Sequence, residues 1–102
     1  MTWKLFLDDV REPTIPGYTI ARSSAMAVVL CVQREELPSF MSLDHDLGES
    51  DTTMIFLKEL YYLWEKMGSD STKVPLYVVH SANPVGTKNI IAYMESWRKS
   101  LQ

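Results

Sequence analysis

Polar side chains that can bind metal ions or move protons follow three short apolar runs of this 102-residue chain. The runs and the residues that follow them are Leu5–Leu7 with Asp8 and Asp9, Met41–Leu43 with Asp44, His45 and Asp46, and Leu76–Val79 with His80, Ser81 and Asn83. Short apolar runs between helical patterns predict parallel strands that are buried on both faces. Ligands of open α/β sheets bind beyond the carboxyl ends of such strands. If the three strands are neighbours, these side chains converge on one pocket suited to metal-assisted phosphate chemistry.

The acidic pair Asp8 and Asp9 is a candidate site for a divalent metal such as Mg²⁺ or Mn²⁺. Hard cations prefer oxygen ligands, often one or two carboxylates together with waters and substrate phosphate. The pair follows a strongly apolar run and is expected to face a second acidic group at Asp44 and Asp46. The alternative interpretation is a solvated turn formed by Asp8, Asp9 and Glu12.

The pentamer Asp44–Gly48 combines two carboxylates, an imidazole and a glycine that allows a tight turn. Asp44 and Asp46 can ligate a metal, while His45 can orient a water or move a proton. His80 can titrate near neutral pH, and it is the preferred proton carrier because it ends a buried run opposite the acidic residues. The competing interpretations are an exposed His45, a capping Asp46 and a structural, hydrogen-bonded His80.

Several side chains near these residues can bind phosphate oxygens. Ser81 and Asn83 can donate hydrogen bonds, and either Arg11 or Arg22 can clamp a phosphate with two parallel hydrogen bonds. Arg11 is preferred because it follows the acidic pair closely.

Four strands and three helices must position these residues. Strands are predicted at 3–7, 18–21, 39–43 and 74–79, and helices at 23–36, 52–67 and 85–101. The first of these helices is expected to bury the apolar residues Ala25, Val28, Val29 and Val32. Residues 8–18 contain too many breakers for a crossover helix. Strand–helix alternation therefore predicts a compact α/β sandwich with a parallel sheet and a shortened or missing first helix.

Length and composition indicate one globular domain, residues 1–102. The net charge of −3 does not favour general nucleic-acid binding, although a metal can offset negative charge for a small nucleotide or an RNA end. The single cysteine, Cys31, cannot form an internal disulfide, so we expect a buried thiol and a cytoplasmic setting. We expect neither a signal peptide nor a membrane span.

The sequence resembles response-regulator receiver domains, and more closely their divergent relatives, the cyclic-phosphate processing receiver-like family. Three stretches carry the resemblance, which covers almost the whole chain: Leu5–Pro13, Ser42–Gly48 and His80–Gly86. The resemblance implies a flavodoxin-like three-layer sandwich. In its sheet, strand 3–7 lies between strands 18–21 and 39–43, and strand 74–79 lies beyond 39–43.

By position, this resemblance implies that Asp8 and Asp9 match the Mg²⁺-binding pair of receivers. It also implies that Asp44 matches the phosphate acceptor and that Ser81 matches the hydroxyl residue after the fourth strand. Receivers also place a lysine after a fifth strand, and both are expected to be missing here, because Lys88 is on another element. The two histidines agree better with the divergent family, which implies processing of a cyclic phosphate on a nucleotide or RNA end.

Three functions compete on these grounds. In a metal-dependent phosphoesterase, the metal ligands are Asp8, Asp9, Asp44 and Asp46, the proton carrier is His45 or His80, and the phosphate ligands are Arg11, Ser81 and Asn83. In an atypical phosphoacceptor receiver, Asp44 is the nucleophile and a partner kinase the donor. In a non-catalytic module, the same pocket holds a nucleotide or a partner protein.

Overall fold

Four parallel strands form one sheet in the order β2-β1-β3-β4 in the computed structural model, which describes residues 2–101. The strands are β1 Lys4–Leu7, β2 Tyr18–Ala21, β3 Phe40–Leu43 and β4 Leu76–Val79. In the register of the sheet, Leu7 pairs with Ala21 and Leu43, and Leu43 pairs with Val79. All four strands therefore end at the same edge, and the strand order predicted from the sequence is confirmed.

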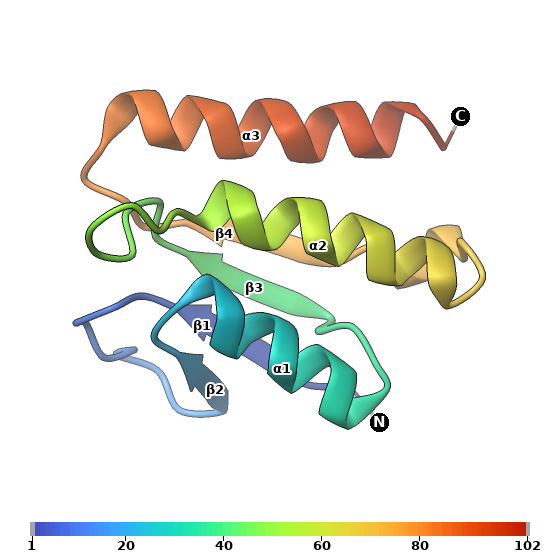
Figure 1. Cartoon of the computed structure of the whole chain (residues 1–102), viewed down its shortest axis with the longest axis horizontal. Helices are drawn as coiled ribbons and strands as arrows, with labels where there is room; N and C mark the ends of the chain where they lie inside the picture. Colours follow the sequence, from blue (N-terminus) through green and yellow to red (C-terminus); the bar gives the residue numbers. More distant parts are fainter. Residues whose placement is uncertain (1, 102) are drawn as a thin grey trace.

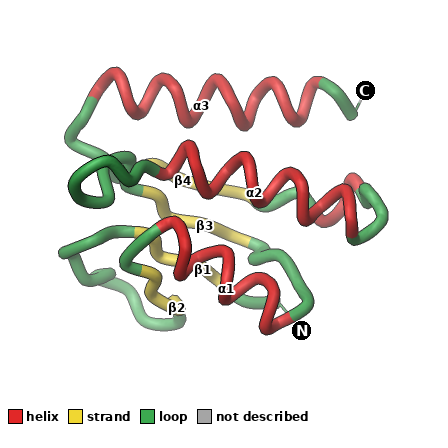
Figure 2. Tube along the Cα trace, viewed as in Figure 1, coloured by secondary structure: helices red, strands yellow, loops and turns green. Residues whose placement is uncertain are grey.

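Three helices lie on one side of the sheet (Figures 1 and 2). They are α1 Ser24–Arg34, α2 Thr53–Lys66 and α3 Pro84–Lys99, and a 3₁₀ turn, Ser71–Lys73, precedes β4. α1 and α2 cover the strands, while α3 packs beside α2 through ring contacts of Trp97 with Tyr61 and Trp64. No helix of the described residues, 2–101, is long and apolar enough to cross a membrane.

The two faces of the sheet have different covers. Alternate residues of a strand point to opposite faces, and Leu5 and Leu7 are fully buried against the helices. On the other face, Phe6 is buried beside the rings of Tyr18 and His80, and the loop of residues 8–17 takes the place of the missing first helix. The described chain also has no fifth strand. The receiver-like α/β fold is confirmed, with its third layer reduced to this loop.

The prediction of the buried face of α1 was wrong for three of its four residues. Ala25, Val29 and Val32 are exposed, whereas Val28 is partly buried against the core; the buried residues of α1 are Ser24, Ala27 and Cys31. Ala27 and Cys31 have small side chains, which suit a helix face that packs against β2 and α2, so side-chain volume as well as hydrophobicity sets the inward face. Cys31 is a buried core thiol, as expected, and burial raises its pKa to about 12.

Candidate metal and phosphate site

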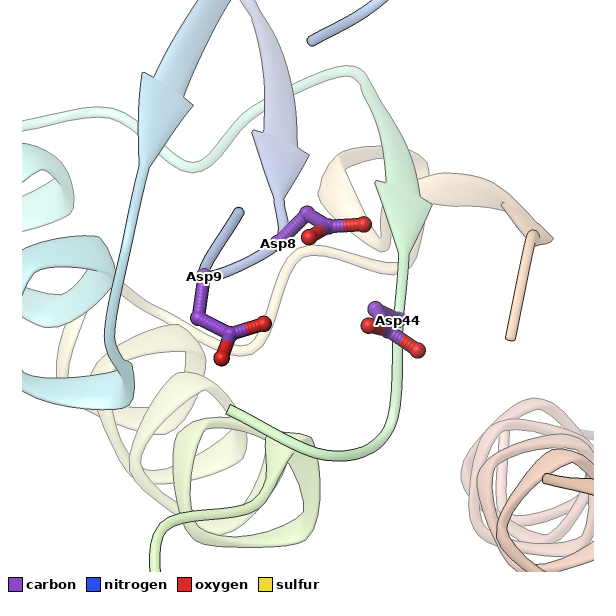
Figure 3. A group of neighbouring side chains, drawn as sticks. All are labelled: Asp8, Asp9 and Asp44. Atoms are coloured by element: carbon purple, nitrogen blue, oxygen red, sulfur yellow. The ribbon is translucent and has the colours of Figure 1, made fainter. Parts of the chain in front are cut away.

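Three carboxylates, Asp8, Asp9 and Asp44, come together at the carboxyl ends of β1 and β3 (Figure 3). The strands are neighbours, and the Asp44 amide donates a hydrogen bond of 2.9 Å to the Leu7 carbonyl between them. One carboxylate oxygen from each of the three residues lies within 4.8 Å of the others. The structure thus brings together three of the four carboxylates that the sequence analysis assigned to a metal.

Asp8 is the most constrained carboxylate of the three. It is fully buried, and its Oδ1 accepts hydrogen bonds from the backbone amides of Val10 (2.9 Å) and Arg11 (2.8 Å). Its Oδ2 lies 2.9 Å from Nε2 of His80. Burial raises the pKa of Asp8, but the hydrogen bonds from Arg11, Val10 and His80 outweigh it, so the pKa lies below its ordinary value. A negative charge is therefore fixed at this point at neutral pH.

Asp9 and Asp44 present oxygens that the protein leaves largely unused. The Asp9 carboxylate has no hydrogen bond or ion pair to any residue between 2 and 101. Asp44 is buried, and its Oδ1 accepts one hydrogen bond, from the His45 amide at 2.8 Å. Closely spaced carboxylates with free lone pairs are the donor set that hard divalent cations prefer. The residues present therefore fit Mg²⁺ or Mn²⁺.

His80 joins this cluster through a chain of hydrogen bonds. Its Nε2 contacts Asp8, its Nδ1 lies 2.8 Å from the Ser42 hydroxyl, and its ring stacks on Phe6 with 4.6 Å between centroids. A carboxylate can only accept, so Nε2 carries a proton, and in the neutral ring Nδ1 accepts from Ser42. Both ring nitrogens are thus engaged, in an arrangement that orients Asp8.

A second polar cluster lies beside the three carboxylates and contains His45, Asp46 and Asn83. Oδ2 of Asp46 accepts a hydrogen bond from the side-chain Nδ2 of Asn83 (3.2 Å), and Oδ1 of Asp46 lies 3.1 Å from Nδ1 of His45. These hydrogen bonds, that of His45 foremost, lower the pKa of Asp46. Asn83 also caps α3 by accepting from the Gly86 amide at 3.0 Å. Asp46 is therefore not among the residues that the structure gathers into the carboxylate cluster.

Arg11 and Arg22 are both near the first loop but make different contacts. Arg11 is half exposed; it donates to the His80 carbonyl at 2.9 Å, and its Nε lies 3.9 Å from Asp8. Arg22 donates to the carbonyls of Asp8 and Arg11 and pairs with Glu12, so it holds the loop. Ser81 is partly buried, and its hydroxyl accepts a hydrogen bond from the backbone amide of Asn83 at 3.0 Å. Arg11 makes one of these hydrogen bonds and Arg22 makes three, so Arg11 has more N–H donors left for a ligand.

Sequence reasoning missed Ser42 and the loop-holding role of Arg22. Ser42 lies inside β3, where a single small polar residue gives no spacing signal. Because strand residues alternate between the two faces of a sheet, Ser42 lies on the same face as Phe6. This position in the alternation is the one sequence feature that pointed toward a contact with His80.

Comparison with known proteins identifies the family. No curated protein and no solved structure matches the chain. A family model described as the cyclic-phosphate processing receiver domain matches residues 3–96. This match includes both strand ends of the carboxylate cluster and all of β4. Because it spans nearly the whole sequence, the chain belongs to the family of cyclic-phosphate processing receiver domains.

Proposed function

We propose that this protein is a metal-dependent phosphoesterase that opens a cyclic phosphate on a nucleotide or an RNA end by attack of water. Membership of the cyclic-phosphate processing family supports the substrate class. The observation that carries the proposal is the cluster of three carboxylates within 4.8 Å, in which Asp9 lacks any partner among the described residues. Such a cluster is electrostatically costly unless a cation compensates it.

Asp9 and Asp44, with Asp8 beside them, would hold the ion, Mg²⁺ or Mn²⁺. A bound divalent ion supplies charge neutralisation at the phosphoryl oxygens and lowers the pKa of a bound water. Asp8 keeps its orientation because two backbone amides and His80 hold its oxygens. The protein thus presents a preformed set of oxygens rather than flexible surface carboxylates.

Arg11 is proposed to bind the phosphate. Its guanidinium is anchored by one hydrogen bond to the His80 carbonyl, which leaves further N–H groups for an anion. It lies next to Asp8, so a phosphate bound there is at the rim of the carboxylate cluster. Ser81 and Asn83 are weaker candidates, because both already take part in the turn that begins α3.

His45 is proposed to exchange the proton. The sequence favoured His80, but both nitrogens of His80 are engaged with Asp8 and Ser42. In His45, Nδ1 lies near Asp46, while Nε2 has no hydrogen bond to any residue in 2–101. His80 is then a positioning residue for Asp8. The engaged state of His80 also favours the second candidate, a module that binds a cyclic phosphate without cleaving it.

Turnover with and without metal tests the proposal. The purified chain is mixed with EDTA, Mg²⁺ or Mn²⁺ and a panel of 2′,3′- and 3′,5′-cyclic nucleotides, and the products are separated by chromatography. We expect metal-dependent opening that is lost in Asp9→Asn and kept in Glu49→Gln, an exposed carboxylate outside the cluster. Binding without product would support the non-catalytic module. A stable acyl phosphate at Asp44 after treatment with a phosphodonor would support the receiver alternative.

A further inference from the structure

A cleft of about 330 Å³ lies on the helix-free side of the sheet. Its floor is formed by strand residues, among them Phe6, Tyr18 and Val78, and its wall by the loop that replaces the first helix, including Ile15. This volume is within the range of small-molecule sites. No helix of residues 2–101 covers this face, so the shortened fold leaves the cleft open.

The lining of the cleft is largely apolar and uncovered. Val78 is 47% exposed and Ile15 is 64% exposed, although both are large aliphatic side chains. Tyr18 adds aromatic surface, and its ring is in edge contact with the buried Phe6 ring, with 5.7 Å between the ring centroids. A flat, weakly polar ring system is the ligand group that gains most from such surfaces.

The cleft adjoins the carboxylate cluster through two of its lining residues. Arg11 and His80 both line it, and both also contact Asp8, at 3.9 Å and 2.9 Å. A ligand in this cleft therefore has its apolar part on Val78 and its anionic part at Arg11. A larger cavity, about 480 Å³, lies near the C-terminal ends of α1 and α2, at residues such as Arg34 and Met67, and has no such connection.

We propose that this cleft binds the nucleobase of a cyclic nucleotide whose phosphate lies at Arg11. This inference rests on the proposed function and adds to it that the protein recognises the base of the substrate, through Tyr18, Ile15 and Val78. It assigns the loop of residues 8–17 a role in recognition. In this arrangement the base lies on the helix-free face of the sheet, and the phosphate lies at the edge where the strands end.

Binding measurements with and without the base test this inference. Isothermal titration calorimetry in Mg²⁺ compares a nucleoside 2′,3′-cyclic phosphate with glycerol 1,2-cyclic phosphate, which has no base. The variants are Val78→Gln and the matched control Leu76→Gln; Leu76 is on the same strand and face and is 61% exposed, but does not line the cleft. Thermal melting checks that both variants fold.

We expect the nucleotide to bind at least about tenfold more tightly than the base-free phosphate, since apolar pocket contacts discriminate by such factors. Val78→Gln should remove most of this preference, and Leu76→Gln should keep it. Equal affinity for the two ligands, or equal effects of the two variants, would overturn the cleft and leave the phosphoesterase proposal standing. A retained base preference without any cleavage would support the cleft and reject hydrolysis. If neither ligand binds, both the cleft and the phosphoesterase proposal are overturned.

Discussion

Neutralising Asp9 should stabilise the metal-free protein. The carboxylate oxygens of Asp8, Asp9 and Asp44 lie within 4.8 Å of one another, and Asp9 has no compensating partner in residues 2–101. At this separation each pair repels by about 1 kcal/mol in a water-like dielectric, which suits a partly exposed group. Removing two such repulsions in Asp9→Asn should raise the free energy of unfolding by about 1–2 kcal/mol, or Tm by roughly 5–15 °C.

The same variant should lose the response to metal. In the wild type, a cation at 100 times its Kd adds about 2.7 kcal/mol to the free energy of unfolding. Scanning calorimetry in EDTA and in a Mg²⁺ series should therefore rank the two proteins differently. Asp9→Asn has the higher Tm without metal, and its Tm rises less than that of the wild type when Mg²⁺ is added. Glu49→Gln, which removes an exposed charge outside the cluster, is the control. An Asp9→Asn protein that melts no higher than the wild type in EDTA, or that responds equally to Mg²⁺, would refute the electrostatic reasoning.

Four further outcomes follow from contacts at the site and in the core. Asp8→Asn should lower the free energy of unfolding in EDTA by about 1–3 kcal/mol, the reverse of Asp9→Asn, because it disturbs buried hydrogen bonds to the backbone; urea denaturation measures this. Since the folded pKa of Asp8 is lowered, its stabilisation should be present above about pH 4, the ordinary value, and disappear as pH falls through the folded pKa, which acid melts would show. Gly86→Ala should lower the free energy of unfolding by about 1–3 kcal/mol, because a Cβ there would clash with the His45 ring. Exposed Asn89→Ala is the control, and equal melting of the two variants would contradict this contact. Cys31 should resist a thiol reagent in the folded protein at pH 8, and rapid labelling of the native protein would contradict its burial. The free energy of unfolding should fall as pH rises above about 8.5 toward 12, because only the thiol of the unfolded chain ionises readily in this range.

The sheet and the position of the site could be predicted because both follow from short-range patterns. Apolar runs mark the strands, and a parallel arrangement makes the residues after β1, β3 and β4 share one edge. The contacts within the site could not be derived this way. Whether His80 faces Asp8 or solvent depends on the direction of a side chain 72 residues away in the chain, which no local pattern encodes.

Two other features depend on packing volumes rather than on sequence periodicity. α1 buries Ala27 and Cys31 while larger aliphatic residues such as Val29 stay exposed, since the helix lies close to its neighbours. The cleft beside Val78 arises from the absence of a helix on one face, and only the course of the loop at residues 8–17 gives it a wall. Breakers in that loop predicted the missing helix but not the concave surface that it leaves.

The hydrogen bond between Asp8 and His80 joins the end of the first strand to the end of the last one. During synthesis, Asp8 emerges early and remains without its imidazole partner until residue 80 has left the ribosome and β4 has paired with β3. A chain that stops after β3 has Asp8, Asp9 and Asp44 and the two backbone amides that bind one oxygen of Asp8, but it lacks the imidazole that binds the other oxygen. The full set of hydrogen bonds on Asp8 is thus a property of the completed sheet.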